Sequence, residues 1–181
     1  YLGAGKDHIL LCGLQEYVDG EILDPWRYFG PNYLHSLYES MVIDDLPVHI
    51  LVNKAKRSIK GFVQKIRQMI SDTGYLPDLA GIGNLILTPD AQLKLVDINN
   101  IVEIKLDDHI LIDDKGYPSC DVSVEVLSIL ERDLLNEEIH MDDPLYNLFL
   151  APSRRKEVKE LEKAFYKKIS SSTASARGME L

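Results

Sequence analysis

The sequence predicts a mostly helical α+β fold, and three observations support this. Apolar residues recur at steps of three and four from residue 48 to residue 72, which indicates the buried face of one long helix. Two short apolar runs, 85–87 and 93–96, flank the turn-forming residues 88–91, as in a β-hairpin. A strongly apolar helical stretch then begins at Asp121. Long helices with one short hairpin between them are typical of an α+β domain.

The other elements are shorter and follow from local patterns. An apolar run predicts a strand at 8–15, and a helix is expected at 33–40 after an aromatic loop at 26–29. Thr73-Gly74 should end the long helix. One or two short strands, including 109–112, lie in an acidic segment after the hairpin, and the rest is helical with breaks near 142–144 and 151–152. We expect a single domain over residues 1–169 and a flexible, Ser-rich tail at 170–181.

Composition narrows the functional classes. The chain has 181 residues, of which 45% are hydrophobic, and a net charge of −9. That length suffices for one domain with its own core, and the negative charge argues against nucleic acid as the main partner. No apolar run is long enough to span a membrane, and no signal peptide is recognisable. The spacing of the two cysteines, Cys12 and Cys120, does not suggest a zinc site, so a cytoplasmic setting is expected.

The hairpin predicts a cation site. Asn84 directly precedes its first apolar run and Asp97 directly follows its second, so the two residues should lie at the same end of the hairpin. An amide oxygen and a carboxylate are ligands that a hard divalent cation prefers. The alternative is that Asn84 is a loop amide bonded to the backbone and that Asp97 merely ends a strand.

This arrangement resembles the catalytic centre of the protein-kinase-like superfamily, most closely the aminoglycoside-phosphotransferase type of small-molecule kinase. In that family a catalytic loop ends in an Asn, a hairpin follows, and its second strand delivers the Asp of an Asp-Phe-Gly motif. Asn84 and Asp97 are thirteen positions apart, the usual family spacing, although the motif here reads Asp97-Ile98-Asn99. The resemblance implies that Asn84 and Asp97 hold Mg²⁺ against the phosphates of ATP.

The loop before Asn84 departs from the family pattern, in which His-Arg-Asp or His-Gly-Asp precedes the Asn by a fixed interval. The one carboxylate is Asp78, six positions before Asn84 instead of five, and Leu76 or Pro77 stands where the family has His. Either the loop carries one extra residue, or Leu79 occupies the position of the catalytic base. Asp78 is the candidate catalytic residue.

Other segments extend the resemblance. Glu16 and Val18, in the sequence Glu-Tyr-Val, resemble the hinge whose backbone groups recognise adenine. The long helix at 48–72 resembles the buried helix that precedes the catalytic loop. Asp121 resembles the family Asp that begins a later helix and holds the backbone of the catalytic loop. Each also has an ordinary alternative, since Glu16 fits a solvated strand end and Asp121 fits a helix N-cap.

The resemblance covers mainly the C-terminal lobe. No Gly-rich phosphate loop or strand Lys is recognisable before the hinge, so residues 1–18 are expected to be a remnant of the N-terminal lobe with the hinge, and 19–169 the C-terminal lobe. The expected function is a fragmentary or degenerate phosphotransferase with an ATP and Mg²⁺ site and a small-molecule or protein acceptor. The alternatives are an inactive pseudokinase that serves as a binding or regulatory module, and an unrelated helical domain that binds a partner through its aromatic segment at 26–38.

Overall fold

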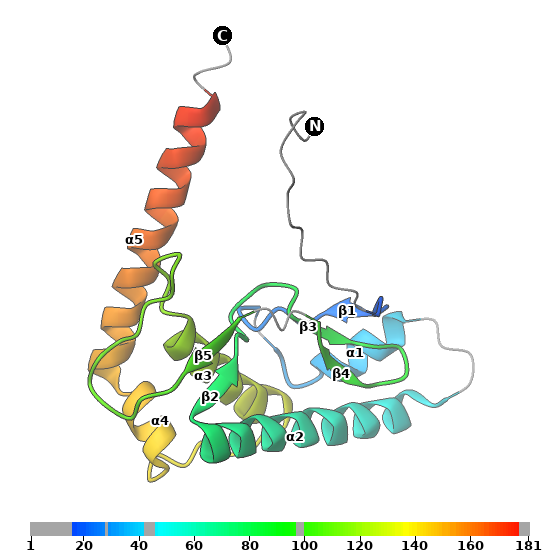
Figure 1. The fold of residues 1–181 in the computed structure, drawn as a ribbon. Helices are drawn as coiled ribbons and strands as arrows, with labels where there is room; N and C mark the ends of the chain where they lie inside the picture. Colours follow the sequence, from blue (N-terminus) through cyan, green and yellow to red (C-terminus); the bar gives the residue numbers. More distant parts are fainter. Residues whose placement is uncertain (1–15, 28, 42–45, 97–99, 178–181) are drawn as a thin grey trace, which may run out of the picture.

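The computed structural model describes residues 16–27, 29–41, 46–96 and 100–177, with side chains as far as Ser170. These residues form a mostly helical α+β fold with five α-helices and two small antiparallel sheets, which confirms the predicted class (Figure 1). In chain order the elements are β1 (Glu21–Ile22), α1 (Tyr33–Ser40), α2 (Val48–Thr73), β2 (Tyr75–Pro77), β3 (Leu85–Leu87), β4 (Leu93–Leu95), β5 (Ile101–Glu103), α3 (Ser119–Ile129) with its π-helical continuation η1 (Leu130–Leu134), α4 (Pro144–Phe149) and α5 (Pro152–Arg177).

Helix α2 is the predicted long helix. It buries one face, made by Leu51, Ala55, Ile59, Val63 and Ile66 at steps of three and four residues. It ends at Gly74, which has a φ of 72° and donates its backbone N–H to the carbonyl of Ile70. A left-handed residue at this position is favourable for glycine, so the predicted stop is confirmed.

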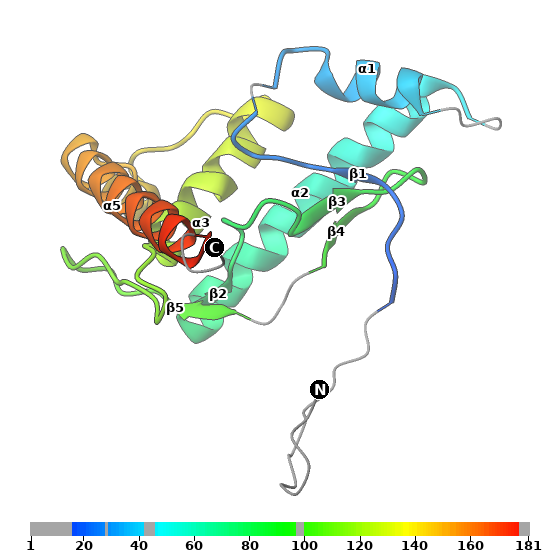
Figure 2. The same ribbon diagram turned by 90° about the horizontal axis from the view of Figure 1, so that it is seen from above.

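The two sheets lie along α2. Strands β1, β3 and β4 form one antiparallel sheet in that order, and β2 pairs with β5 in the other. Figures 1 and 2 show the first sheet beside the N-terminal part of α2 and the second near its C-terminal end. The hydroxyl oxygen of Ser58 in α2 accepts the backbone N–H of Leu93, 2.9 Å away, which fixes β4 against the helix. The predicted hairpin is therefore confirmed as β3–β4.

The predicted strand at 8–15 lies outside the described residues. The segment 109–112 is not a strand; the chain that pairs with β2 is β5, at Ile101–Glu103. Residues 101–103 and 109–112 are both rich in apolar residues, but β2 pairs with the first of these segments.

Helix α3 lies at the centre of the fold, since every one of its residues is buried. Helices α4 and α5 follow it, and α5 runs along one side of the molecule and projects beyond it (Figure 1). The backbone of α5 continues through Arg177, so the helix extends into the stretch predicted as a flexible tail. Within the described ranges, no helix is both long and apolar enough to cross a membrane.

Candidate functional site

The Asp78 loop, residues 78–84, connects β2 to β3. The carboxylate of Asp78 accepts three hydrogen bonds inside the protein: Oδ1 accepts the backbone N–H of Ala80 at 2.9 Å and the hydroxyl of Ser123 at 3.4 Å, and Oδ2 accepts the amide of Asn100 at 3.2 Å. The bond to Ala80 is an Asx turn, which folds the loop locally. The other two donors come from distant parts of the chain, so Asp78 fastens its loop to the start of β5 and to α3.

The loop backbone is fixed by the same two neighbours. The N–H of Asp78 donates to the carbonyl of Asn100 at 2.9 Å, and the N–H of Leu79 donates to the hydroxyl oxygen of Ser123 at 2.9 Å. Ser123 therefore accepts from the loop backbone and donates to the loop carboxylate. Because α3 is buried along its whole length, this contact attaches the loop to the close-packed core of the fold.

Asn84 ends the loop and is folded back onto it. Its Nδ2 donates to the carbonyl of Asp78 at 3.0 Å, and its own carbonyl accepts the N–H of Val96 at 2.9 Å. No described residue donates a hydrogen bond to its Oδ1. A Cβ added at Gly81 would lie 2.6 Å from that Oδ1, so a glycine is needed for the amide to take this position.

The structure thus brings Asp78 and Asn84 into one loop. Asp97, the other predicted metal ligand, lies outside the described residues, and the predicted pair with Asn84 stays a prediction. Val96 is held beside Asn84 by the extended hairpin ladder. Among the residues whose side chains the structure describes, no cluster of three or more His, Cys, Asp or Glu is placed to hold a metal ion.

The predicted hinge residues lie in irregular chain just before β1. Glu16 is exposed and Val18 is half-buried. Beyond them, Gly20 approaches β3 so closely that a Cβ would lie 2.3 Å from the carbonyl oxygen of Leu87. The predicted adenine contacts of Glu16 and Val18 remain a prediction.

Asp121 has a different partner from the one predicted. It lies in the first turn of α3 and is buried, but no described residue of the Asp78 loop bonds to its carboxylate. Instead it forms a two-bond ion pair with Arg154 of α5, with Nε to Oδ1 at 2.5 Å and Nη2 to Oδ2 at 3.2 Å. Burial raises the pKa of the Asp121 carboxyl, and the guanidinium offsets part of that rise. The predicted contact with the loop is made by Ser123, two residues further on.

Arg154 connects three segments. Besides Asp121, its guanidinium donates to the carbonyls of Asp107 at 2.6 Å and His109 at 3.0 Å, and it stacks over the ring of Phe149 at 4.5 Å. All five N–H donors of a guanidinium point in a fixed plane, which suits such a junction. The acidic segment after β5 is therefore tied to α5 and α3. Sequence reasoning missed Arg154, as it missed Asn100 and Ser123, because no local pattern singles them out.

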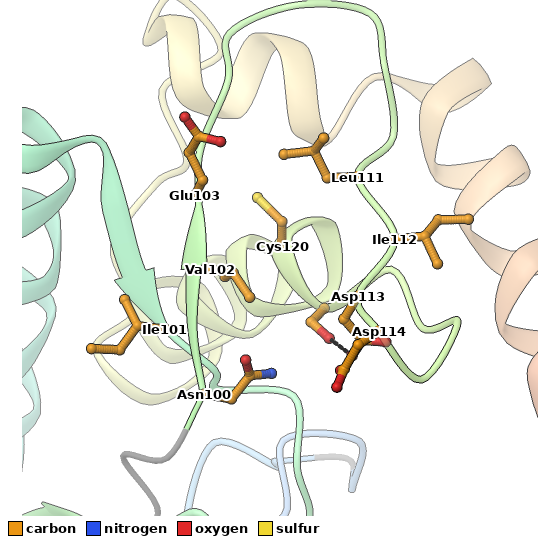
Figure 3. A pocket seen from close by; sticks show the side chains of 10 residues that line it. Asn100, Ile101, Val102, Glu103, Leu111, Ile112, Asp113, Asp114 and Cys120 are labelled. Carbon is orange, nitrogen blue, oxygen red and sulfur yellow. Dashed lines mark hydrogen bonds between the residues drawn. The ribbon is translucent and has the colours of Figure 1, made fainter.

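A pocket of about 290 Å³ adjoins the Asp78 loop (Figure 3). It lies between β5 and residues 111–114, with Asn100 at one end, so the residue that holds Asp78 also lines the pocket. The thiol of Cys120 forms part of its floor. Burial raises the pKa of that thiol to about 12, so it is protonated at neutral pH and a poor nucleophile.

Comparison of the chain with models of known protein families, with curated proteins and with solved structures finds no match. Its function must therefore be inferred from the Asp78 loop, the hairpin and their contacts.

Proposed function

We propose that the protein is a degenerate kinase-like domain that binds a divalent cation and nucleotide phosphates at Asn84 and Asp97, and that it does not transfer a phosphoryl group. The order of its elements supports this proposal. A long helix that buries one face, α2, precedes a loop that ends in Asn84. The β3–β4 hairpin follows, and the buried helix α3 begins after an irregular segment. That is the order in the C-terminal lobe of the kinase-like fold, in which the Asn and the Asp after the hairpin hold the metal.

The position of Asn84 is the observation that carries the proposal. Its Nδ2 is used to brace the loop, while its Oδ1 accepts no bond from any described residue and its backbone is paired with Val96. An amide oxygen and the carboxylate of Asp97 are donors that suit Mg²⁺. Bound there, the ion would neutralise phosphate charge. The residues of the chain would hold the ion and orient it with respect to the Asp78 loop.

The contacts of Asp78 favour a binding role over catalysis. A catalytic base needs a free acceptor site directed at the substrate hydroxyl. A carboxylate has about four acceptor sites, and Ala80, Asn100 and Ser123 occupy three of those on Asp78. The carboxylate is directed toward α3 and β5, and Asp78 stands one position further from Asn84 than the kinase pattern has. We therefore assign Asp78 to the support of the loop.

The second candidate is an active phosphotransferase in which Asp78 is the base. The direct contact between Asp78 and Asn84 favours it, because catalytic base and metal ligand would then share one loop. The two candidates differ in one measurable property: only the active enzyme should turn over ATP, and only then should Asp78→Asn abolish that turnover.

Cation binding tests the proposal directly. Calorimetry with Mn²⁺ and ATP on the whole chain should show binding that weakens at least about tenfold in Asp97→Asn, since that change removes the charged ligand. The matched control is Asp90→Asn, at the opposite end of the same hairpin, which should bind like the unchanged protein. Equal affinities in both variants would contradict the cation site. ATP turnover lost in Asp78→Asn would show that the active-enzyme candidate is correct.

A second variant tests the geometry without touching a ligand. Gly81→Ala would place a Cβ 2.6 Å from the Asn84 Oδ1, so the amide must move and Mn²⁺–ATP affinity should fall by a similar factor. Gly61→Ala in α2, where a Cβ meets no atom within 4 Å, is the control for a glycine substitution as such. Unchanged affinity in Gly81→Ala would show that Asn84 is not a ligand.

A further inference from the structure

The outer edge of β5 is open, and a pocket lies along it. The N–H of Asp78 bonds to the carbonyl of Asn100, and the N–H of Ile104 bonds to the carbonyl of Gly74, so the even-numbered residues of this stretch face β2. Ile101 and Glu103 must then direct their backbone N–H and C=O groups away from β2. In the part of the chain that the structure describes, these groups have no backbone partner. Unpaired backbone groups along a strand are a template for another strand.

A second unpaired segment faces this edge across the pocket. Figure 3 shows residues 111–114 running beside β5, with the hollow between them. The backbone groups of Leu111 and Ile112 form no hydrogen bond with any described residue. Val102, Leu111 and Cys120 point into the hollow and make its floor apolar (Figure 3). The pocket thus has two backbone edges and an apolar floor.

The size of the pocket favours side chains over a whole small molecule. Its volume of about 290 Å³ is at the lower limit of pockets that enclose drug-sized ligands, which span roughly 300–1,000 Å³. The groove is also acidic: its lining includes Glu103, Asp113 and Asp114 and contains no Lys, Arg or His. The carboxylate of Asp113 is used by Ser119 and by backbone N–H groups, and that of Glu103 pairs with Lys105 at 3.0 Å, so Asp114 is the acid left to face a ligand.

We propose that this groove binds a basic, extended peptide segment, which adds to β5 as a third strand. Alternate apolar side chains of the segment would enter the hollow over Val102 and Cys120, as the period of two of a strand requires. Its other side chains would face solvent on the same side as Glu103, where Lys or Arg of the segment would share or replace Lys105 as the partner of that carboxylate. This inference does not depend on the cation site, although Asn100 lies between the two.

Defined peptides test the proposal. A capped peptide of about seven alternating Lys and Val residues should bind the whole chain in fluorescence polarisation and should slow amide hydrogen exchange at Ile101 and Glu103. The same peptide with N-methylated amides on the edge that faces β5 should bind at least about tenfold more weakly, because it cannot donate to the strand. A Glu/Val peptide of equal length should not bind. Equal binding of all three peptides, or no binding of the Lys/Val peptide, would overturn the proposal.

Variants of the protein give an independent readout. Glu103→Pro removes a backbone N–H that does not bond to β2, and the proline ring blocks the open edge of β5. An edge strand tolerates proline at such a position. It should lose peptide binding, whereas Glu103→Ala should weaken it only a few-fold through the lost charge. Asp114→Lys should also weaken binding of the Lys/Val peptide through charge repulsion. Asp114 lies in an exposed turn outside β5, so this variant leaves the strand itself unchanged. Sedimentation of the chain without peptide gives its oligomeric state. If the chain is a dimer and Glu103→Pro makes it a monomer, a second copy occupies the open edge of β5, and the peptide assignment is overturned.

Discussion

Replacement of Arg154 by Met should strongly destabilise the protein. The side chains of Arg154 and Asp121 expose only 6% and 2% of their surface, so the pair is shielded from water. Met keeps much of the apolar stem over Phe149 and removes the charge. The main consequence is a carboxylate buried without its partner, which typically costs about 3–5 kcal/mol.

The other contacts of Arg154 add less. The carbonyls of Asp107 and His109 lie in an exposed segment, where water can replace the guanidinium. Loss of the stacking on Phe149 costs about 1 kcal/mol or less, because the Met side chain still covers part of the ring. We therefore expect a total of about 4 kcal/mol, a large part of the roughly 5–15 kcal/mol by which a domain is stable.

Urea unfolding followed by circular dichroism measures this cost. The control is Arg155→Met, the next residue, whose side chain is 48% exposed where it pairs with Glu125; exposed pairs contribute about 1 kcal/mol or less. The double variant Asp121→Asn/Arg154→Met should be more stable than the sum of the single effects predicts, by at least about 1.5 kcal/mol. Equal costs for Arg154→Met and Arg155→Met, or strictly additive effects in the double variant, would refute the reasoning.

Three further predictions follow from described contacts. Gly20→Ala should lower the free energy of unfolding by at least about 2 kcal/mol, because the new Cβ would lie 2.3 Å from the Leu87 carbonyl oxygen. Gly61→Ala, where a Cβ meets no atom within 4 Å, should raise the free energy of unfolding by about 0.5–1 kcal/mol. Urea unfolding of the two variants measures both changes. Burial raises the pKa of Glu131 above its usual 4.5, so the folded state holds this proton more tightly than the unfolded chain. Unfolding measured from about pH 4 to about pH 7 should show stability lost as the pH rises through that raised pKa, and Glu131→Gln should remove this contribution. Cys120, with a pKa of about 12, should resist alkylation at pH 7 in the native protein and react rapidly in urea, as peptide mapping would show; fast native labelling would contradict its burial.

The elements that the sequence predicts well are those with a local signal. The apolar face of α2 repeats through Leu51, Ala55, Ile59, Val63 and Ile66, so its helical period is visible without any partner. The β3–β4 hairpin is recognisable because its turn residues separate two apolar runs. Both signals lie within a few residues of one another along the chain.

The contacts that could not be predicted join distant residues. Asp121 and Arg154 are 33 positions apart, and nothing in the sequence distinguishes Arg154 from the adjacent Arg155, which is half exposed. Asn100 reads as a turn residue until β5 pairs with β2 and places it beside Asp78. Long-range pairing, rather than the type of residue, decides these roles.

The junction around Asp78 also bears on the order of folding. Its carboxylate bonds to residues 22 and 45 positions away, so three separate parts of the chain must be in place before it forms. Closing such loops costs entropy before any contact compensates for it, whereas α2 and the β3–β4 hairpin need only near neighbours. The junction should therefore form after the folding transition state. A substitution there that weakens the loop should accelerate unfolding and leave the folding rate almost unchanged.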